Sequence, residues 1–246
     1  MVYWNQRTVY ALMFSCVSTT LTDFGLNPKH LGAHIGMTMV LHTHSRRLDY
    51  HPHIHVVVPG GGIDKKRRQW KKKKGQYLFN QKALAKVFRA RFLDALNKQG
   101  LSVPRGVTSK WVVDCRRVGT GITALKYLSR YLYRGVISER NIVSNQNGRV
   151  TFKYVESQTG KICYRTLKGE HFLHLILCHV LPKGFRRVRD YGFLHSNAKK
   201  LLFLAQLVLH VQIKIMAIRP KPVFRCPCCN SPMIVVRVRT AGTKPG

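Results

Sequence analysis

Hydrophobic residues recur along this chain with two different periods, one typical of helices and one typical of strands. Apolar side chains spaced three and four residues apart predict helices, because such positions lie on one side of a helix. The helices predicted in this way cover residues 8–17, 84–96, 123–133 and 170–180. Gly100 is a stop signal after the second of them, and Thr123 is a candidate N-cap for the third.

Runs rich in β-branched residues predict strands, and turn-forming residues separate them. Residues 36–44 and 52–58 flank a polar, basic turn at residues 45–49, which predicts an antiparallel pair. The other predicted strands are residues 110–115 and a hairpin of residues 150–155 and 162–167. Helices mixed with antiparallel strands indicate an α+β fold.

Two prolines mark a predicted division of the chain near its C-terminal end. Pro220 and Pro222 lie in a basic segment, which predicts a linker rather than a helix or strand. We therefore expect one main domain over residues 1–218 and a small appendage over residues 219–246.

The charge of the chain narrows the choice of partners. Its 246 residues include 43 Lys and Arg against nine Asp and Glu, a formal net charge of +34. A chain so charged repels itself unless a polyanion binds, so nucleic acid is the expected partner. A membrane surface is the alternative, but the charge is spread over the whole chain rather than confined to one tail or helix. Hydrophobic residues at 45% provide enough material for a core.

Two apolar stretches, residues 8–17 and 201–218, are candidates for membrane or export segments. The first lacks the small-residue cleavage pattern of a signal peptide, and the second contains Gln206, His210 and Lys214, which lipid would leave unsatisfied. We therefore expect no transmembrane helix. Four of the seven cysteines stand singly among apolar neighbours, which is typical of reduced thiols in a cytoplasmic protein.

A pair of histidines in the second predicted strand suggests a metal site. His53 and His55 are separated by one residue, so on a strand both imidazoles lie on one face, while Ile54 lies on the other. The alternative is that both are structural histidines with ordinary hydrogen bonds. For a third ligand we favour His42 on the preceding strand, with His44 and His51 as rivals.

The donor set constrains the metal only weakly. Three imidazoles suit zinc or manganese, whereas magnesium prefers oxygen ligands and would need phosphate oxygens to complete its shell. A divalent ion, Mg or Mn, is the expected cofactor.

Two tyrosines form the second candidate group. Tyr127 and Tyr131 are four residues apart, so both phenols share one face of the predicted helix, flanked by Arg130 and Arg134. A tyrosine can attack a phosphodiester, but its pKa near 10 requires a metal or a base nearby. The alternative is a pair of core aromatic residues with their hydroxyls at the rim.

A basic loop follows the second predicted strand. It holds eight cations around one tryptophan, which could stack on an unpaired base, although phosphate contact is the favoured role. The predicted DNA-binding residues of the loop are Lys65, Lys66, Arg67, Arg68, Trp70, Lys71, Lys72, Lys73 and Lys74, joined by Arg130 and Arg134 of the tyrosine helix.

The histidines and tyrosines together indicate one reaction. A metal would polarise the scissile phosphate while a tyrosine attacks it, which needs neither water nor paired carboxylates. The nine acidic residues are scattered, so a two-metal carboxylate nuclease is disfavoured.

In these motifs the chain resembles the insertion sequence 91 family of rolling-circle transposases, which are HUH single-strand endonucleases. The resemblance covers residues 41–44 with 50–62, residues 126–135, and residues 179–194 with their Leu-Pro-Lys-Gly-Phe motif. It implies that His53 and His55 bind a divalent metal, and that Tyr127, Tyr131 or both form 5′-phosphotyrosine links that leave a free 3′-hydroxyl. It also implies a split, ferredoxin-like antiparallel sheet.

One feature departs from that family. Its members commonly begin with a cysteine-rich zinc module, and this chain starts almost at its first predicted helix. A shortened copy that nicks DNA but recognises the element's ends poorly is therefore an expected possibility.

A cysteine knuckle lies near the C-terminal end. Cys226 and Cys229 form a C-x-x-C motif that could hold zinc, but a tetrahedral site needs two further ligands. The alternative is a thiol-rich tail without a metal.

Three functions are compatible with these residues. The leading hypothesis is a bacterial, nucleoid-associated transposase that nicks and rejoins single-stranded DNA at the ends of a mobile element. A plasmid relaxase or replication initiator would use the same chemistry on another DNA sequence. A non-catalytic DNA-binding protein would show salt-sensitive binding and no covalent product.

Overall fold

The protein is described from a computed structural model, which covers residues 2–73, 75, 78–119, 121–133, 136–212 and 223–234. In the helix that spans residues 121–133, the side chains of residues 125, 127 and 130–133 are not described. The chain divides into two compact units, residues 1–211 and 212–246. The predicted boundary between residues 218 and 219 lies outside the described residues and stays a prediction.

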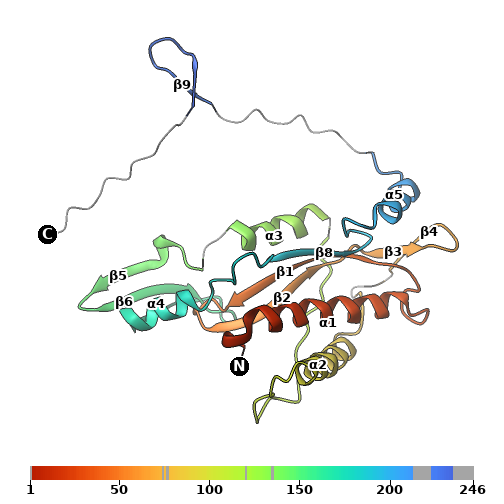
Figure 1. Cartoon of the computed structure of the whole chain (residues 1–246), viewed down its shortest axis with the longest axis horizontal. Helices are drawn as coiled ribbons and strands as arrows, with labels where there is room; N and C mark the ends of the chain where they lie inside the picture. The colour runs from red at the N-terminus through yellow and green to blue at the C-terminus, as the bar shows by residue number, and fades with distance from the viewer. Residues whose placement is uncertain are drawn as a thin grey trace. The chain divides into compact units, whose positions relative to one another are not determined.

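A three-stranded antiparallel sheet forms the centre of the first unit, in the order β2-β1-β8 (Figure 1). Its strands are β1 (Gly36–His44), β2 (Tyr50–Val57) and β8 (Val188–Gly192). The first two match the predicted pair, whereas β8 was not predicted, because it is short and two of its five residues, Arg189 and Asp190, are charged. Gly192, at φ +61°, ends β8 where a side chain would collide with the backbone of Ile35.

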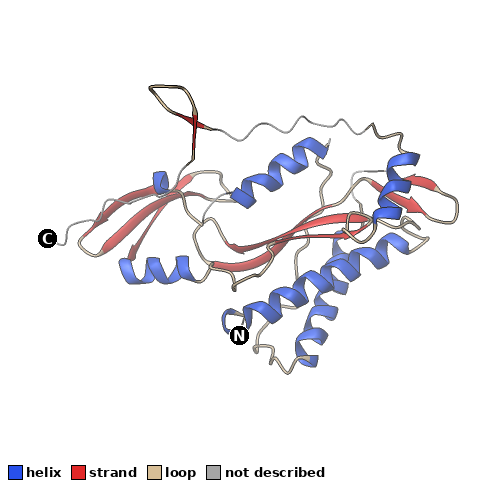
Figure 2. Cartoon of the chain, turned by 45° about the horizontal axis from the view of Figure 1, so that its top comes forward, coloured by secondary structure: helices blue, strands red, loops and turns tan. Residues whose placement is uncertain are grey.

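One face of this sheet carries the main hydrophobic core. The helices α1 (Gln6–Leu26) and α2 (Gln81–Lys98) lie on that side, as Figures 1 and 2 show. Alternate residues of β1, Met37, Met39 and Leu41, are buried there together with Tyr10 and Phe14 of α1. The residues between them, including Val40 and His42, therefore face the opposite side of the sheet.

The helix α3 (Gly121–Tyr133) lies on that opposite side and contacts both β1 and β2 (Figure 1). Its Ala124 and Leu128, four residues apart, are buried. Its amphipathic pattern therefore agrees with the predicted helix of residues 123–133 and turns one side toward the sheet.

A second antiparallel sheet has the order β5-β6-β7. It consists of β5 (Ile142–Gln146), which was not predicted, and the predicted hairpin β6 (Arg149–Val155) and β7 (Ile162–Lys168). The helix α4 (Gly169–Leu177) covers one face, where Phe172 packs with Phe152 of β6.

The remaining elements correct two predictions. Residues 110–115 form no strand: Trp111 packs against Phe88 and Phe92 of α2, so the alternation reflects contact with a helix rather than with a sheet. The predicted basic loop is partly a hairpin, β3 (Gly61–Asp64) and β4 (Gln69–Lys72). The helix α5 (Lys199–Val208) begins two residues before the apolar stretch 201–218, overlaps it, and was not predicted.

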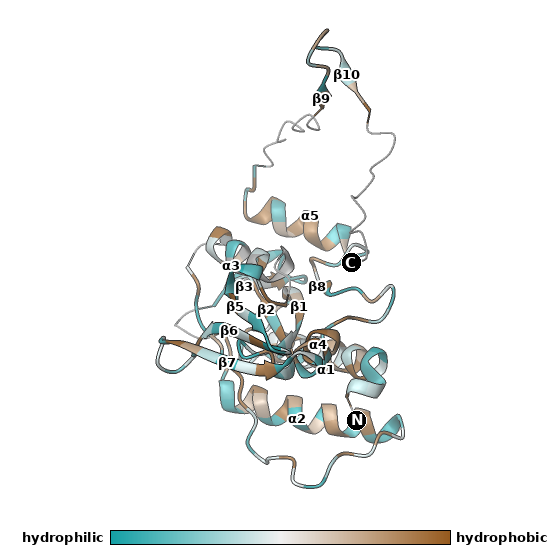
Figure 3. Cartoon of the chain, turned by 90° about the vertical axis from the view of Figure 1, so that its left-hand side faces the viewer, coloured by the Kyte–Doolittle hydropathy of each residue, from teal (hydrophilic) through white to brown (hydrophobic). Residues whose placement is uncertain are grey.

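The helices carry both hydrophobic and hydrophilic residues (Figure 3). Among the described residues, one helical segment, Tyr3–Leu26, is long and apolar enough to span a membrane by length and composition alone. Its Val9, Tyr10 and Phe14 are nevertheless buried against the central sheet, as in the core helix of a globular domain.

The second unit is described at residue 212 and over residues 223–234. Two short strands, β9 (Phe224–Arg225) and β10 (Pro232–Met233), pair as a hairpin around the cysteine knuckle. The overall class is α+β with antiparallel sheets, as predicted.

Candidate metal and nucleic-acid site

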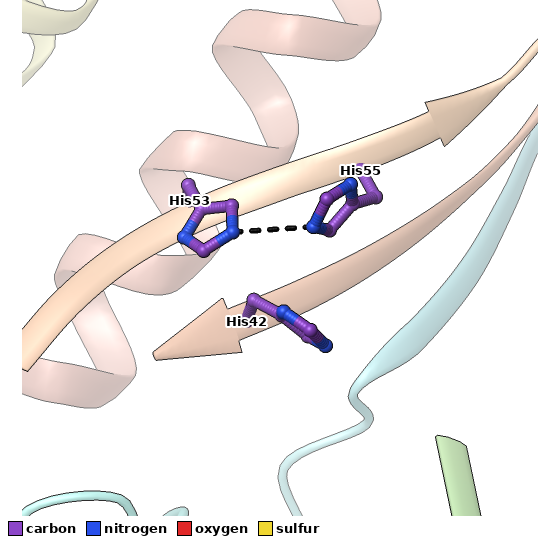
Figure 4. A group of neighbouring side chains, drawn as sticks. All are labelled: His42, His53 and His55. Carbon is purple, nitrogen blue, oxygen red and sulfur yellow. Dashed lines mark hydrogen bonds between the residues drawn. The ribbon is translucent and has the colours of Figure 1, made fainter. Parts of the chain in front are cut away.

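Three histidines meet on the face of the central sheet that is opposite to α1. His42 of β1 lies directly across from His53 of β2, and His55 lies two residues further along β2 (Figure 4). Nitrogen atoms of the three rings all lie within 4.8 Å of one another, and the Nε2 atoms of His53 and His55 are 3.1 Å apart. The pairing of β1 with β2 thus brings His42 next to His53, which lies eleven residues later in the sequence.

Burial keeps these imidazoles neutral. Burial, followed by the nearby rings of His55 and His53, lowers the pKa of His42 to about 3. Burial and His53 lower the pKa of His55 to about 4, and burial also lowers the pKa of His53. Neutral imidazole is the form that binds a metal, so at neutral pH all three rings retain a lone pair.

A backbone hydrogen bond assigns the roles of the two nitrogens of His53. Its Nδ1 lies 2.7 Å from the carbonyl oxygen of His51, which can only accept a hydrogen bond. Nδ1 therefore carries the proton, and the lone pair of Nε2 points toward His55. Metal-binding histidines are commonly oriented in this way by a bond at the other ring nitrogen.

The three side chains fit a divalent transition ion. With metal–nitrogen distances near 2.1 Å, neighbouring ligand atoms lie about 3 to 3.4 Å apart, and the His53–His55 separation of 3.1 Å matches this. Three neutral protein ligands leave further coordination positions for oxygen atoms of a substrate. Among the described residues, no other group of three metal-binding side chains meets the same criterion.

The rival ligands occupy the next layer. The ring of His44 stacks on His42, with centroids 5.4 Å apart, and lies 5.2 Å from the ring of His179. A register shift between His42 and His44 pairs His44 with Tyr50 instead of continuing the ladder. His51 is exposed and touches the site through its carbonyl oxygen. Neither rival therefore belongs to the group of three.

His179 is a neighbour of the site that the residue pattern did not identify. It is 3% exposed, its Nε2 lies 3.2 Å from the carbonyl oxygen of Leu48, and its ring stacks on Tyr50. Because burial also lowers the pKa of His179, a second neutral imidazole layer supports the first. No periodicity could reveal this, since His179 precedes β8 and reaches the site only through the fold.

The predicted nucleophiles belong to α3, whose backbone the structure describes. The side chains of Tyr127, Tyr131 and Arg130, and the whole of Arg134, lie outside the described part of the chain. Their predicted roles are thus untested.

The basic hairpin β3–β4 holds some of its predicted DNA-binding residues in internal contacts. Lys71 Nζ lies 3.0 Å from Asp64 Oδ2 and donates to the carbonyl oxygen of Gly32 at 3.0 Å. The hydrogen bond from Lys71, followed by hydrogen bonds from backbone N–H groups, lowers the pKa of Asp64 to about 2. The Trp70 ring lies 6.0 Å from that of Phe193. Lys72 is exposed, and no side-chain hydrogen bond or ion pair of Lys72 is found among the described residues.

The exposed cations of this hairpin are a solvated basic surface. Lys65, Lys66, Arg67 and Arg68 occupy its exposed turn, whereas residue 74 is not described. Phosphate contact therefore remains the predicted role of this turn.

The cysteine knuckle forms a tight turn. Cys226 N–H donates to the carbonyl of Ser231, and hydrogen bonds with Ser231 and then Cys226 hold the pKa of Cys229 below its usual value. A lowered thiol pKa favours metal binding, but zinc at this knuckle stays a prediction.

Comparisons with known proteins show the family that this chain is similar to. Residues 36–201 match the family described as "Putative transposase". The chain is 34% identical over 221 residues to "Putative transposase y4qJ" of Sinorhizobium fredii, covering 80% of this chain and 56% of that protein. It is 28% identical over 186 residues to "Transposase for insertion sequence element IS801" of Pseudomonas savastanoi pv. phaseolicola, covering 69% of this chain and 45% of that protein.

The chain thus spans about half the length of these curated relatives. No solved structure matches it. The matched family region contains both sheets, the histidine group and α3. The chain therefore belongs to the insertion sequence 91 family of transposases.

Proposed function

We propose that this chain nicks and rejoins single-stranded DNA at the ends of a mobile element, through a covalent link between DNA and tyrosine. The observation that carries the proposal is the group of His42, His53 and His55, three neutral imidazoles on the sheet face that α3 contacts. A DNA-processing enzyme without a described carboxylate cluster needs another way to hold a metal, and this group supplies it.

His42, His53 and His55 would hold a divalent ion, which when bound polarises a phosphate oxygen. The protein's own contribution is positional. The strands β1 and β2 fix the three rings, the His51 carbonyl fixes the tautomer of His53, and burial keeps the rings deprotonated. Such a site is preorganised before DNA binds.

The nucleophile is proposed to come from α3. Ala124 and Leu128 are buried, and helical periodicity assigns positions 124, 127, 128 and 131 to one arc of about 100°. Tyr127 and Tyr131 are therefore expected on the side of α3 that meets the sheet, whereas Tyr133 falls outside this arc.

The proposed step exchanges one phosphoester bond for another. The phenolic oxygen forms a bond to phosphorus, and the bond between phosphorus and the 3′ oxygen breaks. The phenolic proton is released to solvent, and the leaving 3′ oxygen takes up a proton to become a hydroxyl. Attack of a 3′-hydroxyl on the 5′-phosphotyrosine reverses these changes and rejoins the strand, so neither water nor a nucleotide is consumed.

A covalent-adduct assay tests the proposal. The full chain is incubated with manganese or magnesium and labelled single-stranded oligonucleotides from the flanks of its gene, and the products are separated on a denaturing gel. We expect a labelled protein band with the wild type and its loss in Tyr127→Phe, Tyr131→Phe or the double variant.

Tyr133→Phe is the matched control, because it removes one phenolic hydroxyl from the same helix outside the proposed arc. An adduct that survives the double variant would exclude these nucleophiles. DNA binding without an adduct under either metal would exclude the enzymatic function.

A further inference from the structure

The second sheet has one face that no described element covers. Along β6 and β7, burial alternates. Val150 and Phe152 of β6 point toward α4, while the residues that alternate with them along the strand point away. The register pairs Arg149 with Lys168, Thr151 with Thr166, and Lys153 with Tyr164 across the two strands. We call these six residues the outer face: Arg149, Thr151, Lys153, Tyr164, Thr166 and Lys168.

This face carries a solvent-exposed aromatic ring. Tyr164 is 64% exposed, and its neighbours at the same end of the sheet, Ile162 and Val155, are also exposed. The inner face differs, since Phe152 is 1% exposed and packs on Phe172. An exposed tyrosine in the middle of a strand gains nothing from burial, so its ring is available to a ligand.

Positive charge lies on the same face as that ring. Arg149 and Lys168 lie directly opposite each other, an arrangement of like charges that destabilises a strand pair. Lys153 is the cross-strand neighbour of Tyr164. All residues of β5, β6 and β7 are described, and none of them is acidic. An anion between these cations would remove the repulsion.

Hydroxyl groups complete the surface. Thr151 and Thr166 face each other with their Oγ1 atoms 2.8 Å apart, between the Arg149–Lys168 pair and Tyr164. Threonine hydroxyls commonly bind phosphate oxygens. Cations, hydroxyls and an open aromatic ring on one pleated surface are the elements that bind single strands, by phosphate contact and by base stacking.

We propose that the outer face binds single-stranded DNA, with a base stacked on Tyr164 and phosphates held by Arg149, Lys153 and Lys168. Single strands are favoured over duplex, because only an unpaired base presents a face to the ring.

This surface is fixed to the polypeptide that carries the histidines. Arg165, on the inner face of β7, donates to Asp49 Oδ1 at 2.7 Å and to the carbonyl of Arg47. Both belong to the turn that joins β1 to β2, and thus His42 to His53. DNA bound on the outer face would therefore be tethered to the sheet that carries the proposed cleavage site.

The inference rests on the proposed function only in taking DNA as the substrate, so its test avoids cleavage. Fluorescence anisotropy measures binding of labelled oligothymidylate to the full chain in the Tyr127→Phe/Tyr131→Phe background with EDTA. Tyr164→Ala is expected to weaken binding about 5- to 100-fold, whereas Tyr164→Phe, which keeps the ring, stays within about twofold. Lys168→Gln is expected to lower the slope of log affinity against log salt by about 0.7.

Trp4→Ala is the matched control, since Trp4 is 84% exposed but belongs to the N-terminal 3-10 helix. Its affinity should remain within about twofold of the parent. The proposal is overturned if Tyr164→Ala binds like the parent, if Trp4→Ala loses as much, or if Tyr164→Ala weakens duplex binding equally. Failure of the adduct assay would not affect any of these readings.

Discussion

The two central strands, β1 and β6, are each the middle of a three-stranded antiparallel sheet but meet different surroundings. In β1, seven of nine residues are buried, among them the polar residues His42 and Thr43. In β6, buried and more exposed residues alternate, because α4 covers one face only. A sheet enclosed on both sides places polar groups where water is scarce, whereas an open sheet displays them.

The chemistry of each sheet follows from this difference. On the central sheet, burial lowers the pKa of His42 and His55 and so prepares neutral metal ligands. On the outer face, cations and a tyrosine remain in solvent, where long-range attraction to phosphate operates. Under the two proposals, catalysis would take place on the first sheet and DNA would be held on the second.

Removal of one ligand should have the largest effect. His53→Ala should reduce covalent-adduct formation more than about 100-fold, because two imidazoles hold a divalent ion poorly. DNA affinity should stay within about twofold, since the ring positions a metal rather than DNA. Both are measured with the same oligonucleotides, by denaturing gel and by anisotropy.

His51→Ala provides the matched control, because the exposed His51 ring lies outside the group of three and its carbonyl is retained. It should keep most of the activity. Adduct formation by His53→Ala at the wild-type rate would remove the metal role from the central sheet.

The two faces of the second sheet should differ sharply in stability. Phe152→Ala should lower the free energy of unfolding by about 3 to 5 kcal/mol, because its ring is fully enclosed against Phe172. Tyr164→Ala should change it by less than about 0.5 kcal/mol. Urea denaturation of both variants checks this, and similar losses would mean that the outer face is covered.

Acid should destabilise the metal-free central sheet. The pKa of His42 is about 3 in the folded chain and about 6.5 unfolded, so between these values the unfolded state binds more protons. Stability is therefore lost as the pH falls below about 6.5, by up to about 1.4 kcal/mol per pH unit from this group. Urea midpoints from pH 7 to 4.5 in EDTA measure the slope.

A His42→Gln variant isolates that contribution, because glutamine does not titrate. The variant should show a shallower pH dependence than the wild type. Equal slopes would mean that His42 does not titrate with the depressed pKa that its burial gives it.

The smallest effect concerns two adjacent lysines of the basic hairpin. Lys72→Ala should weaken DNA binding for all sequences and lower the salt slope by about 0.7 to 0.9, with unchanged stability, since Lys72 is exposed. Lys71→Ala should also lower stability, because it leaves Asp64 and the Gly32 carbonyl without this partner. Salt titrations and urea melts separate the two. A sequence-selective loss in Lys72→Ala would contradict phosphate contact.

Much of the fold was predictable because its patterns are local. The strand bounds of β1, the β6–β7 hairpin and the helices α2 to α4 follow from periodicity and turn residues, with ends that shifted by a few residues. The helix α1 extends nine residues beyond its predicted end at residue 17. The segment 110–115 misled because a strand and an extended segment on a helix share the same alternation. Short elements such as β5 and β8 contain too few residues to show a recognisable hydrophobic period.

The sequence by itself determined the α+β class, the pair His53 and His55 on one strand face, and the strong positive charge, since strand geometry and net charge are properties of the chain. Only the tertiary structure decided which histidine is the third of the group. His42 and His44 have the same parity, but the regular ladder pairs His42 with His53, and a register shift after His42 pairs His44 with Tyr50 and leaves its ring near His179. The same holds for Lys71, whose charge the sequence displays but whose contacts with Asp64 and Gly32 exist only in the folded chain.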